Sequence, residues 1–131
     1  MPNKARFYCG IALLSAAILM FELLLTRLFA VAEWYHFAFL SVSVALLGYA
    51  FSGTVLALIP LDIRPRLIPI LGVGLPISLL GAYWMVNKVP FDSYQLAWDR
   101  RQIAYLIVYY LSLIVPFVVG GLIVAHWLAW M

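Results

Sequence analysis

The sequence predicts an all-α polytopic membrane protein, a bundle of four transmembrane helices with a short interfacial helix before the fourth. Hydrophobic residues make up 67% of its 131 residues and charged residues only 10%, against roughly 45–50% and about 25% in an ordinary soluble domain. Four apolar stretches reach the length of about 20 residues that a helix needs to cross a hydrocarbon layer roughly 30 Å thick. The alternation expected of barrel strands is missing, and lone strands would leave backbone groups unpaired in lipid.

The four stretches form a single predicted transmembrane domain. We place the spans at residues 7–29, 36–59, 67–86 and 103–127. Short connections join the first three spans, which predicts that consecutive helices are antiparallel neighbours in a compact bundle.

The connection before the fourth span is longer, and residues 87–102 combine large aromatic side chains with polar and charged ones. This composition is typical of a segment that lies in the headgroup layer of a membrane. Two pairs have the acid-x-x-Gln spacing of a helix N-terminus, namely Asp92 with Gln95 and Asp99 with Gln102. We therefore expect a short interfacial helix at about residues 91–99, followed by the fourth span.

Composition and charge exclude several classes of protein. So apolar a chain can be neither a soluble enzyme nor a disordered tail. A formal net charge of +3, scattered along the sequence, is too small for a phosphate-binding surface, so no nucleic-acid partner is expected. The single cysteine, Cys9, forms neither an internal disulfide nor a thiolate metal site by itself. The lipid bilayer is the expected partner.

Basic residues near the ends of the spans predict the orientation of the chain. Lys4 and Arg6 precede the first span, and Arg64 and Arg66 lie in the tight connection between the second and third. Because short loops and the first helix dominate topology, we expect the N-terminus and the C-terminus in the cytoplasm. The expected location is a membrane.

The most costly residue of the predicted spans is an acid. Glu22 lies several residues inside the first span, where an acidic group costs about 2.5–3.5 kcal/mol unless it is paired, protonated or open to water. Such a carboxylate could handle a proton or a cation, or it could be structural and bonded to a neighbouring helix. Arg27 is five residues away and does not share a face with Glu22 as an i, i+4 partner would. We therefore expect the partner of Glu22 on another helix.

Three further residues complete this candidate intramembrane polar site. Arg27 is close enough to the predicted membrane edge to extend its guanidinium to phosphate or to Glu33. His36 lies in an aromatic cluster at the start of the second span, either as part of the interfacial belt or as a proton shuttle near Glu33. The other histidine, His126, is expected at the opposite membrane face, so we expect no bound metal or cofactor. No catalytic set can be assembled from the sequence.

Prolines and glycines interrupt the third and fourth spans. Because proline removes a backbone donor, helix bends are predicted at Pro69, Gly72, Gly74, Pro76 and Pro116. The bend in the third span either packs against neighbouring helices, which we favour, or lines a transport site. Small residues predict close helix packing at two further places, Gly48 with Ser52 and Gly120 with Gly121.

Several signatures carry a resemblance to a known family. They are FELLLTRLF at 21–29, WYHFAFL at 34–40, ALLG at 45–48, VPFDSY at 89–94, LAWD at 96–99, YY at 109–110, PF at 116–117 and GGL at 120–122. Over nearly its whole length the sequence resembles the N-terminal membrane region of large bacterial spermidine synthase-like proteins. In that family a soluble α/β domain follows the membrane region, and its catalytic motifs have no counterparts in these residues. The resemblance therefore assigns no catalytic residue, although Glu22, Arg27 and His36 match its membrane motif.

Three functions are open on this basis. We expect an integral membrane domain that acts as an anchor or assembly module, with helix partners from another subunit or from a longer protein of which this chain is the N-terminal part. The first alternative is a transport module for a cationic solute such as a polyamine, with Glu22, Arg27 and the cluster around His36 along its path. The second is the membrane part of a spermidine synthase-like enzyme whose catalytic domain lies outside this sequence.

Overall fold

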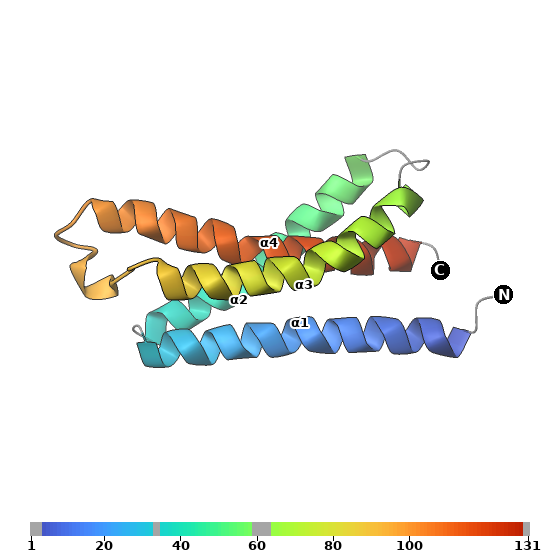
Figure 1. Cartoon of the computed structure of the whole chain (residues 1–131), viewed down its shortest axis with the longest axis horizontal. Coiled ribbons are helices and arrows are strands. Elements are labelled where there is room, and N and C mark those ends of the chain that lie inside the picture. Colours follow the sequence, from blue (N-terminus) through green and yellow to red (C-terminus); the bar gives the residue numbers. More distant parts are fainter. Residues whose placement is uncertain (1–3, 33–34, 59–63, 130–131) are drawn as a thin grey trace.

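The computed structural model describes residues 4–32, 35–58 and 64–129, apart from the side chains of residues 35, 36, 64 and 65. These residues form four α-helices and one 3-10 turn, in the order α1 Lys4–Ala32, α2 Tyr35–Leu58, α3 Arg64–Lys88, η1 Ser93–Gln95 and α4 Arg101–Ala129 (Figure 1). Each α-helix is long and apolar enough to cross a membrane. The predicted all-α fold with four such helices is confirmed.

The helices α1, α3 and α4 extend beyond the apolar stretches that predicted them. Their additional turns carry polar residues such as Lys4 at the start of α1 and Lys88 at the end of α3. Hydropathy marks only the part of a helix that lies in lipid, whereas the backbone hydrogen bonds continue into the headgroup layer. The bounds of α2 agree with the prediction to within one residue.

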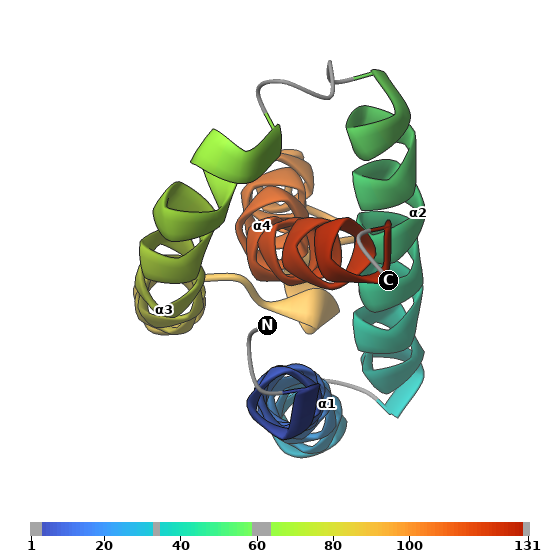
Figure 2. The same cartoon turned by 90° about the vertical axis from the view of Figure 1, so that its right-hand side faces the viewer.

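Helix α4 occupies the centre of the bundle, with α1, α2 and α3 around it (Figure 2). Its buried positions run along nearly its whole length, from Gln102 to His126. Helices α2 and α3 are consecutive in the sequence but make few contacts with each other, because each packs on α4. The C-terminal end of α2 and the N-terminal end of α3 both lie away from α4 (Figures 1 and 2). The prediction of consecutive neighbours holds for α1 with α2 and for α3 with α4, and it is wrong for α2 with α3.

The closest approaches between helices occur at glycines. A β-carbon added to Gly48 of α2 would lie 2.6 Å from the β-carbon of Phe117 on α4. Gly120 of α4 lies directly against Ile18 of α1, and Gly121 lies against Ser52 of α2. Dispersion between closely approaching surfaces is the main attraction between helices in lipid. The packing roles predicted for these small residues are confirmed.

Aromatic rings fill the core at the end of the bundle where α4 begins. The ring centroids of Phe29 on α1 and Tyr109 on α4 lie 5.6 Å apart, and Phe91 lies 5.6 Å from Tyr109 and 5.7 Å from Phe37 on α2. These separations are typical of favourable aromatic pairs. Phe91 belongs to the connection between α3 and α4, so its ring holds that connection against α2 and α4.

The predicted interfacial helix is a single 3-10 turn, Ser93–Gln95. Asp92 caps it, since its Oδ1 accepts the backbone N–H of Tyr94 at 2.9 Å and its Oδ2 accepts a hydrogen bond from Gln95 Nε2 at 3.0 Å. The capping role predicted from the spacing of Asp92 and Gln95 is therefore confirmed. A longer helix does not form here, because Asp99 opens a second capped turn only four residues after Gln95.

The second acid-x-x-Gln pair behaves differently from the first. Asp99 Oδ1 accepts the backbone N–H of Arg101 at 2.9 Å and so caps α4. The side chain of Gln102 turns instead toward the connection, where its Oε1 accepts the backbone N–H of Asp92 at 3.1 Å. Gln102 is only 5% exposed, so this hydrogen bond ties the connection to the first turn of α4 from inside the fold.

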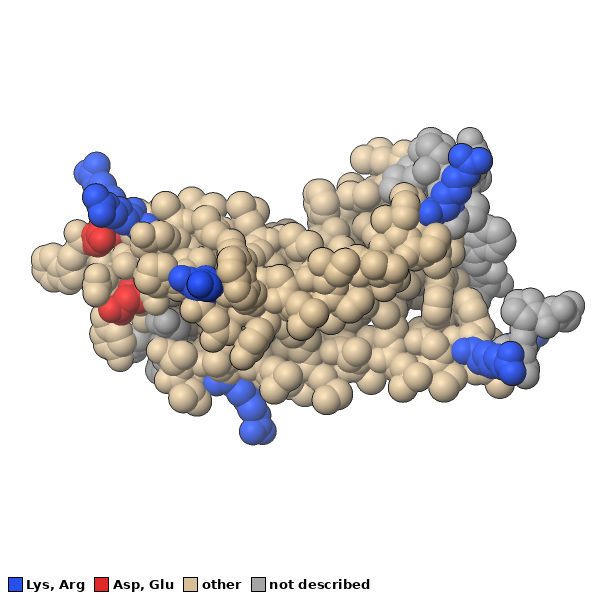
Figure 3. Space-filling view, in the orientation of Figure 1, with Lys and Arg blue, Asp and Glu red and all other residues tan. Residues whose placement is uncertain are grey.

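On the face shown in Figure 3, charged side chains gather toward the two ends of the long axis, and a broad zone without visible charge separates them. Large apolar side chains are exposed throughout that zone, for example Leu23, Phe39 and Leu80. A soluble protein rarely exposes so much contiguous apolar surface. The distribution agrees with a chain that spans a bilayer.

Candidate functional site

Glu22 faces the seam between α1 and α2. It follows the buried residue Ile18 by four positions, which places it about 40° from Ile18 around the helix. Its side chain is half-buried, and Thr26, one turn further along the same side of α1, contacts Ser41 on α2. The acid therefore points toward the edge of the bundle core and not straight into the surrounding lipid.

No described residue forms a hydrogen bond or an ion pair with the carboxylate of Glu22. The hydrogen bond recorded at this residue uses its backbone carbonyl, which accepts the hydroxyl of Thr26 at 2.9 Å. The interhelical bond expected for Glu22 is thus not made within the described part of the chain. An acidic group within an apolar span is costly unless it is paired, protonated or open to water.

Two hydroxyl groups join α1 to α2 one helical turn beyond Glu22. Thr26 Oγ1 and Ser41 Oγ lie 2.7 Å apart, and Ser41 also contacts the Ala38 carbonyl at 2.8 Å. Thr26 also donates its hydroxyl proton to the Glu22 carbonyl. The two hydroxyl groups therefore make three contacts with only two protons, so each proton is not confined to one acceptor. Ser41 is 0% exposed. Sequence reasoning missed this pair, although hydroxyl residues inside apolar spans commonly mark helix contacts.

The other members of the predicted polar site do not join Glu22. Arg27 is exposed and lies about 140° from Glu22 around α1, so the structure separates the two side chains. Glu33 and the side chain of His36 lie outside the described residues. His126 is buried near the C-terminal end of α4, while α2 begins at the opposite end of the bundle (Figure 1).

Helix α3 is continuous through Pro69 and Pro76, as α4 is through the buried Pro116. The bends predicted at these positions stay predictions. Gly72 and Gly74 have no heavy atom within 4 Å of the place where a β-carbon would stand. The third helix therefore carries its glycines on a surface that the described residues leave uncovered, in contrast to the packed glycines of α2 and α4.

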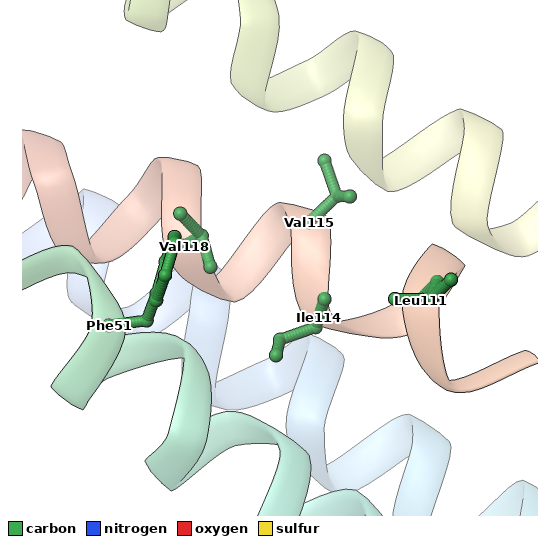
Figure 4. Close-up of a pocket in the computed structure, with 5 residues that line it drawn as sticks. All are labelled: Phe51, Leu111, Ile114, Val115 and Val118. Carbon is green, nitrogen blue, oxygen red and sulfur yellow. The ribbon is translucent and has the colours of Figure 1, made fainter. Parts of the chain in front are cut away.

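An apolar hollow lies between α2 and α4 and opens to the surface, since Phe51, Leu111 and Val115 in its lining are exposed (Figure 4). Its volume is about 350 Å³, and it is lined by Phe51, Leu111, Ile114, Val115 and Val118. None of these side chains offers a hydrogen bond or a charge. The hollow can hold hydrocarbon but does not coordinate a polar solute.

Comparison with known proteins assigns no relative to this chain. No protein-family model matches it, and neither a curated protein nor a solved structure is significantly similar to it. The resemblance to spermidine synthase-like proteins therefore stays a prediction. The fold and the seam between α1 and α2 are the observations from which function is argued.

Proposed function

We propose that this four-helix membrane protein is an anchor and assembly module whose seam between α1 and α2 binds a helix of another polypeptide or of a longer protein containing this chain. The observation that carries the proposal is the Glu22 carboxylate, which is half-buried at bilayer depth and receives no hydrogen bond from a described residue. A helix that supplies a donor or a cation there would remove an unfavourable term of a few kcal/mol. An intramembrane acid without a hydrogen-bond partner in its own chain therefore favours association with another helix over a chain that stays alone in the membrane.

The surroundings of Glu22 support a helical partner. Leu19 and Leu23 on α1 are exposed, and so is Leu46 on α2, so apolar surface borders the carboxylate on both helices. A partner helix could pack on this surface while one polar side chain reaches Glu22. Because apolar packing alone gives little specificity in lipid, the acid would select the partner and fix its depth.

Transport of a cationic solute is the second candidate. The Thr26–Ser41 pair one helical turn from Glu22 favours it, because the carboxylate and the two hydroxyl groups together offer a charge and several oxygen ligands. The hollow between α2 and α4 is apolar, however, and offers no ligand to a cation. A cation path would therefore need further helices, so transport also depends on assembly.

Two substitutions at Glu22 distinguish these functions. The protein is extracted from its native membrane into polymer nanodiscs, and the mass of each complex is measured by native mass spectrometry. We expect the wild type to be larger than one chain and Glu22→Leu to release the single chain, while the exposed neighbour change Leu23→Ala leaves the complex intact. A single-chain wild type, or a Glu22→Leu complex of unchanged mass, contradicts the assembly function.

Glu22→Gln tests the nature of the bond and the transport alternative. Glutamine keeps hydrogen-bonding capacity and removes the charge, so it preserves a complex held by a neutral donor and weakens one held by a cation. If the chain transports a cation, Glu22→Gln abolishes uptake into vesicles while the protein stays folded. Unchanged uptake excludes the transport function.

We also propose, from the sequence resemblance, that the chain is the membrane part of a longer spermidine synthase-like protein in a bacterial inner membrane. The basic residues near the ends of the spans favour a cytoplasmic location for both ends of this sequence. Support comes from the signatures between residues 21 and 122. Sequencing the gene beyond codon 131 tests the first part, since a reading frame that continues into an α/β domain is expected. A stop codon directly after residue 131 contradicts it.

A further inference from the structure

We infer that the end of the bundle where α3 joins α4 binds the headgroups of anionic phospholipids. The surface consists of Lys88, Arg100 and Arg101 with the indole ring of Trp98, and we call it the headgroup surface. It is separate from the Glu22 seam, so it stands independently of the proposed assembly function. The argument rests on the state of the nearby acids, on the placement of the arginines and on the rigidity of the connection.

The two acids of the connection are already engaged. Both carboxylate oxygens of Asp92 accept hydrogen bonds, from the Tyr94 N–H and from Gln95 Nε2. Asp99 Oδ1 accepts the N–H of Arg101. Among the described residues no ion pair joins either acid to Arg100 or to the Arg101 guanidinium, and both arginines are exposed. Their guanidinium groups are therefore open to an external anion.

The arginines do not serve the stability of the helix beside them. Arg101 is the first residue of α4, and positive charge at a helix N-terminus opposes the helix dipole. Exposed side chains add little packing at that position either. Guanidinium groups bind phosphate with two parallel hydrogen bonds, which gives these residues a role that the fold itself does not.

The connection presents these groups from a fixed backbone. Trp98 donates its backbone N–H to the Gln95 carbonyl at 3.0 Å, and Asp99 donates to the same carbonyl at 2.9 Å. The Trp98 side chain is nevertheless 90% exposed. An exposed tryptophan on an ordered turn at the end of a span is typical of the headgroup layer, where the ring is apolar and its N–H meets water.

The position of the cations selects a lipid over a soluble anion. Lys88 is the last residue of α3, and Arg101 is the first residue of α4, so both stand where the spans leave the hydrocarbon. The ammonium group of Lys88 lies 5.5 Å from the centroid of the exposed Trp84 ring. This cation–π contact holds the ammonium group near the end of α3. Lipid phosphates occupy this layer at high local concentration, and a net negative headgroup gains more than a zwitterionic one.

Lipid titration with native mass spectrometry tests the inference on the full chain. The protein in neutral detergent is titrated with phosphatidylglycerol and, separately, with phosphatidylcholine. We expect tighter binding of phosphatidylglycerol, and we expect the double variant Arg100→Gln/Arg101→Gln to lose roughly 30-fold in affinity for it, from the typical contribution of a basic residue near an anionic lipid surface. The preference should weaken as salt is raised.

Matched variants make the result specific. Lys4→Gln/Arg6→Gln removes two positive charges at the other end of the bundle and should keep the wild-type affinity. Arg100→Lys/Arg101→Lys keeps the charge, so it should retain the preference for phosphatidylglycerol over phosphatidylcholine, but with lower affinity, because lysine cannot form two parallel hydrogen bonds to phosphate. Circular dichroism verifies that each variant is helical, and the lysine variant still tests the inference if the glutamine variant does not fold. Equal losses in both glutamine variants, or displacement of the lipid by millimolar inorganic phosphate, would overturn the assignment.

Discussion

Gly48 of α2 lies directly against Phe117 of α4. A methyl group added to Gly48 would lie 2.6 Å from the β-carbon of Phe117, which is too close for two carbon atoms. Phe117 is itself fully buried, and its ring is flanked by Phe21 at 5.8 Å and Tyr49 at 6.4 Å between centroids. The ring therefore has little room to move aside. This contact fixes the distance at which the two helices cross.

The crossing predicts a large effect of a small substitution. Gly48→Ala should lower the free energy of unfolding by about 1–3 kcal/mol, the usual cost of overpacking, as measured by denaturation with sodium dodecyl sulfate in mixed micelles. Gly53→Ala on the same helix is the control, because nothing lies within 4 Å of its added methyl group. Equal stability of the two variants would show that α2 and α4 do not pack in this way.

The hydroxyl pair between α1 and α2 should show measurable coupling. In a double-mutant cycle of Thr26→Val and Ser41→Ala, we expect a coupling free energy of about 0.6 kcal/mol and at most about 1.7 kcal/mol, the range found for interhelical hydrogen bonds in membranes. Ser43→Ala serves as the control partner, since Ser43 bonds within its own helix to the Phe39 carbonyl. Additive effects of Thr26→Val and Ser41→Ala would argue against the bridge.

Gln102 should control the order of the connection between α3 and α4. Gln102→Leu removes the acceptor of the Asp92 N–H, so hydrogen exchange at that amide should become faster, because an unpaired amide opens to water more readily. Gln102→Glu keeps an acceptor oxygen and should retain most of the protection. Unchanged exchange in Gln102→Leu would mean that other contacts, such as the ring of Phe91, hold the connection without this bond.

The proposed orientation can be tested with single cysteines. Cys9 is replaced by serine, and then either Lys4→Cys or Tyr94→Cys is introduced at opposite ends of the bundle. In intact cells, a membrane-impermeant maleimide should label Tyr94→Cys and should reach Lys4→Cys only after the membrane is opened. The reverse pattern would place the N-terminus outside.

The sequence was sufficient to locate the helices but not to pair them. Polar flanks and about 20 apolar residues define each span, and capping spacing correctly identified the turn after Asp92. Which face of α2 packs could not be read, because Val44 and Ala45 are buried while the equally apolar Leu46 and Leu47 face outward. In a soluble protein only the buried pair, Val44 and Ala45, would need to be apolar. In a membrane the outward-facing pair contacts lipid and is apolar as well.

The candidate site was predictable to the same partial extent. Glu22 is conspicuous because acids are rare in spans, and the structure places it one helical turn from the contact between Thr26 and Ser41. That proximity depends on the pairing of α1 with α2 and on the rotation of each helix about its axis. A local sequence pattern predicts neither the pairing of the helices nor their rotation. The position of Glu22 relative to Thr26 and Ser41 was therefore visible only in the structure.

The central position of α4 has a consequence for biogenesis. This helix follows the other three in the chain, yet α2 and α3 find their main contacts on it and not on each other. During synthesis α1 and α2 can pair as soon as both are inserted, whereas α3 would remain loosely associated until the fourth helix enters the membrane. Protein released by a ribosome that stalls before Arg101 should stay unassembled and be degraded rapidly by membrane proteases.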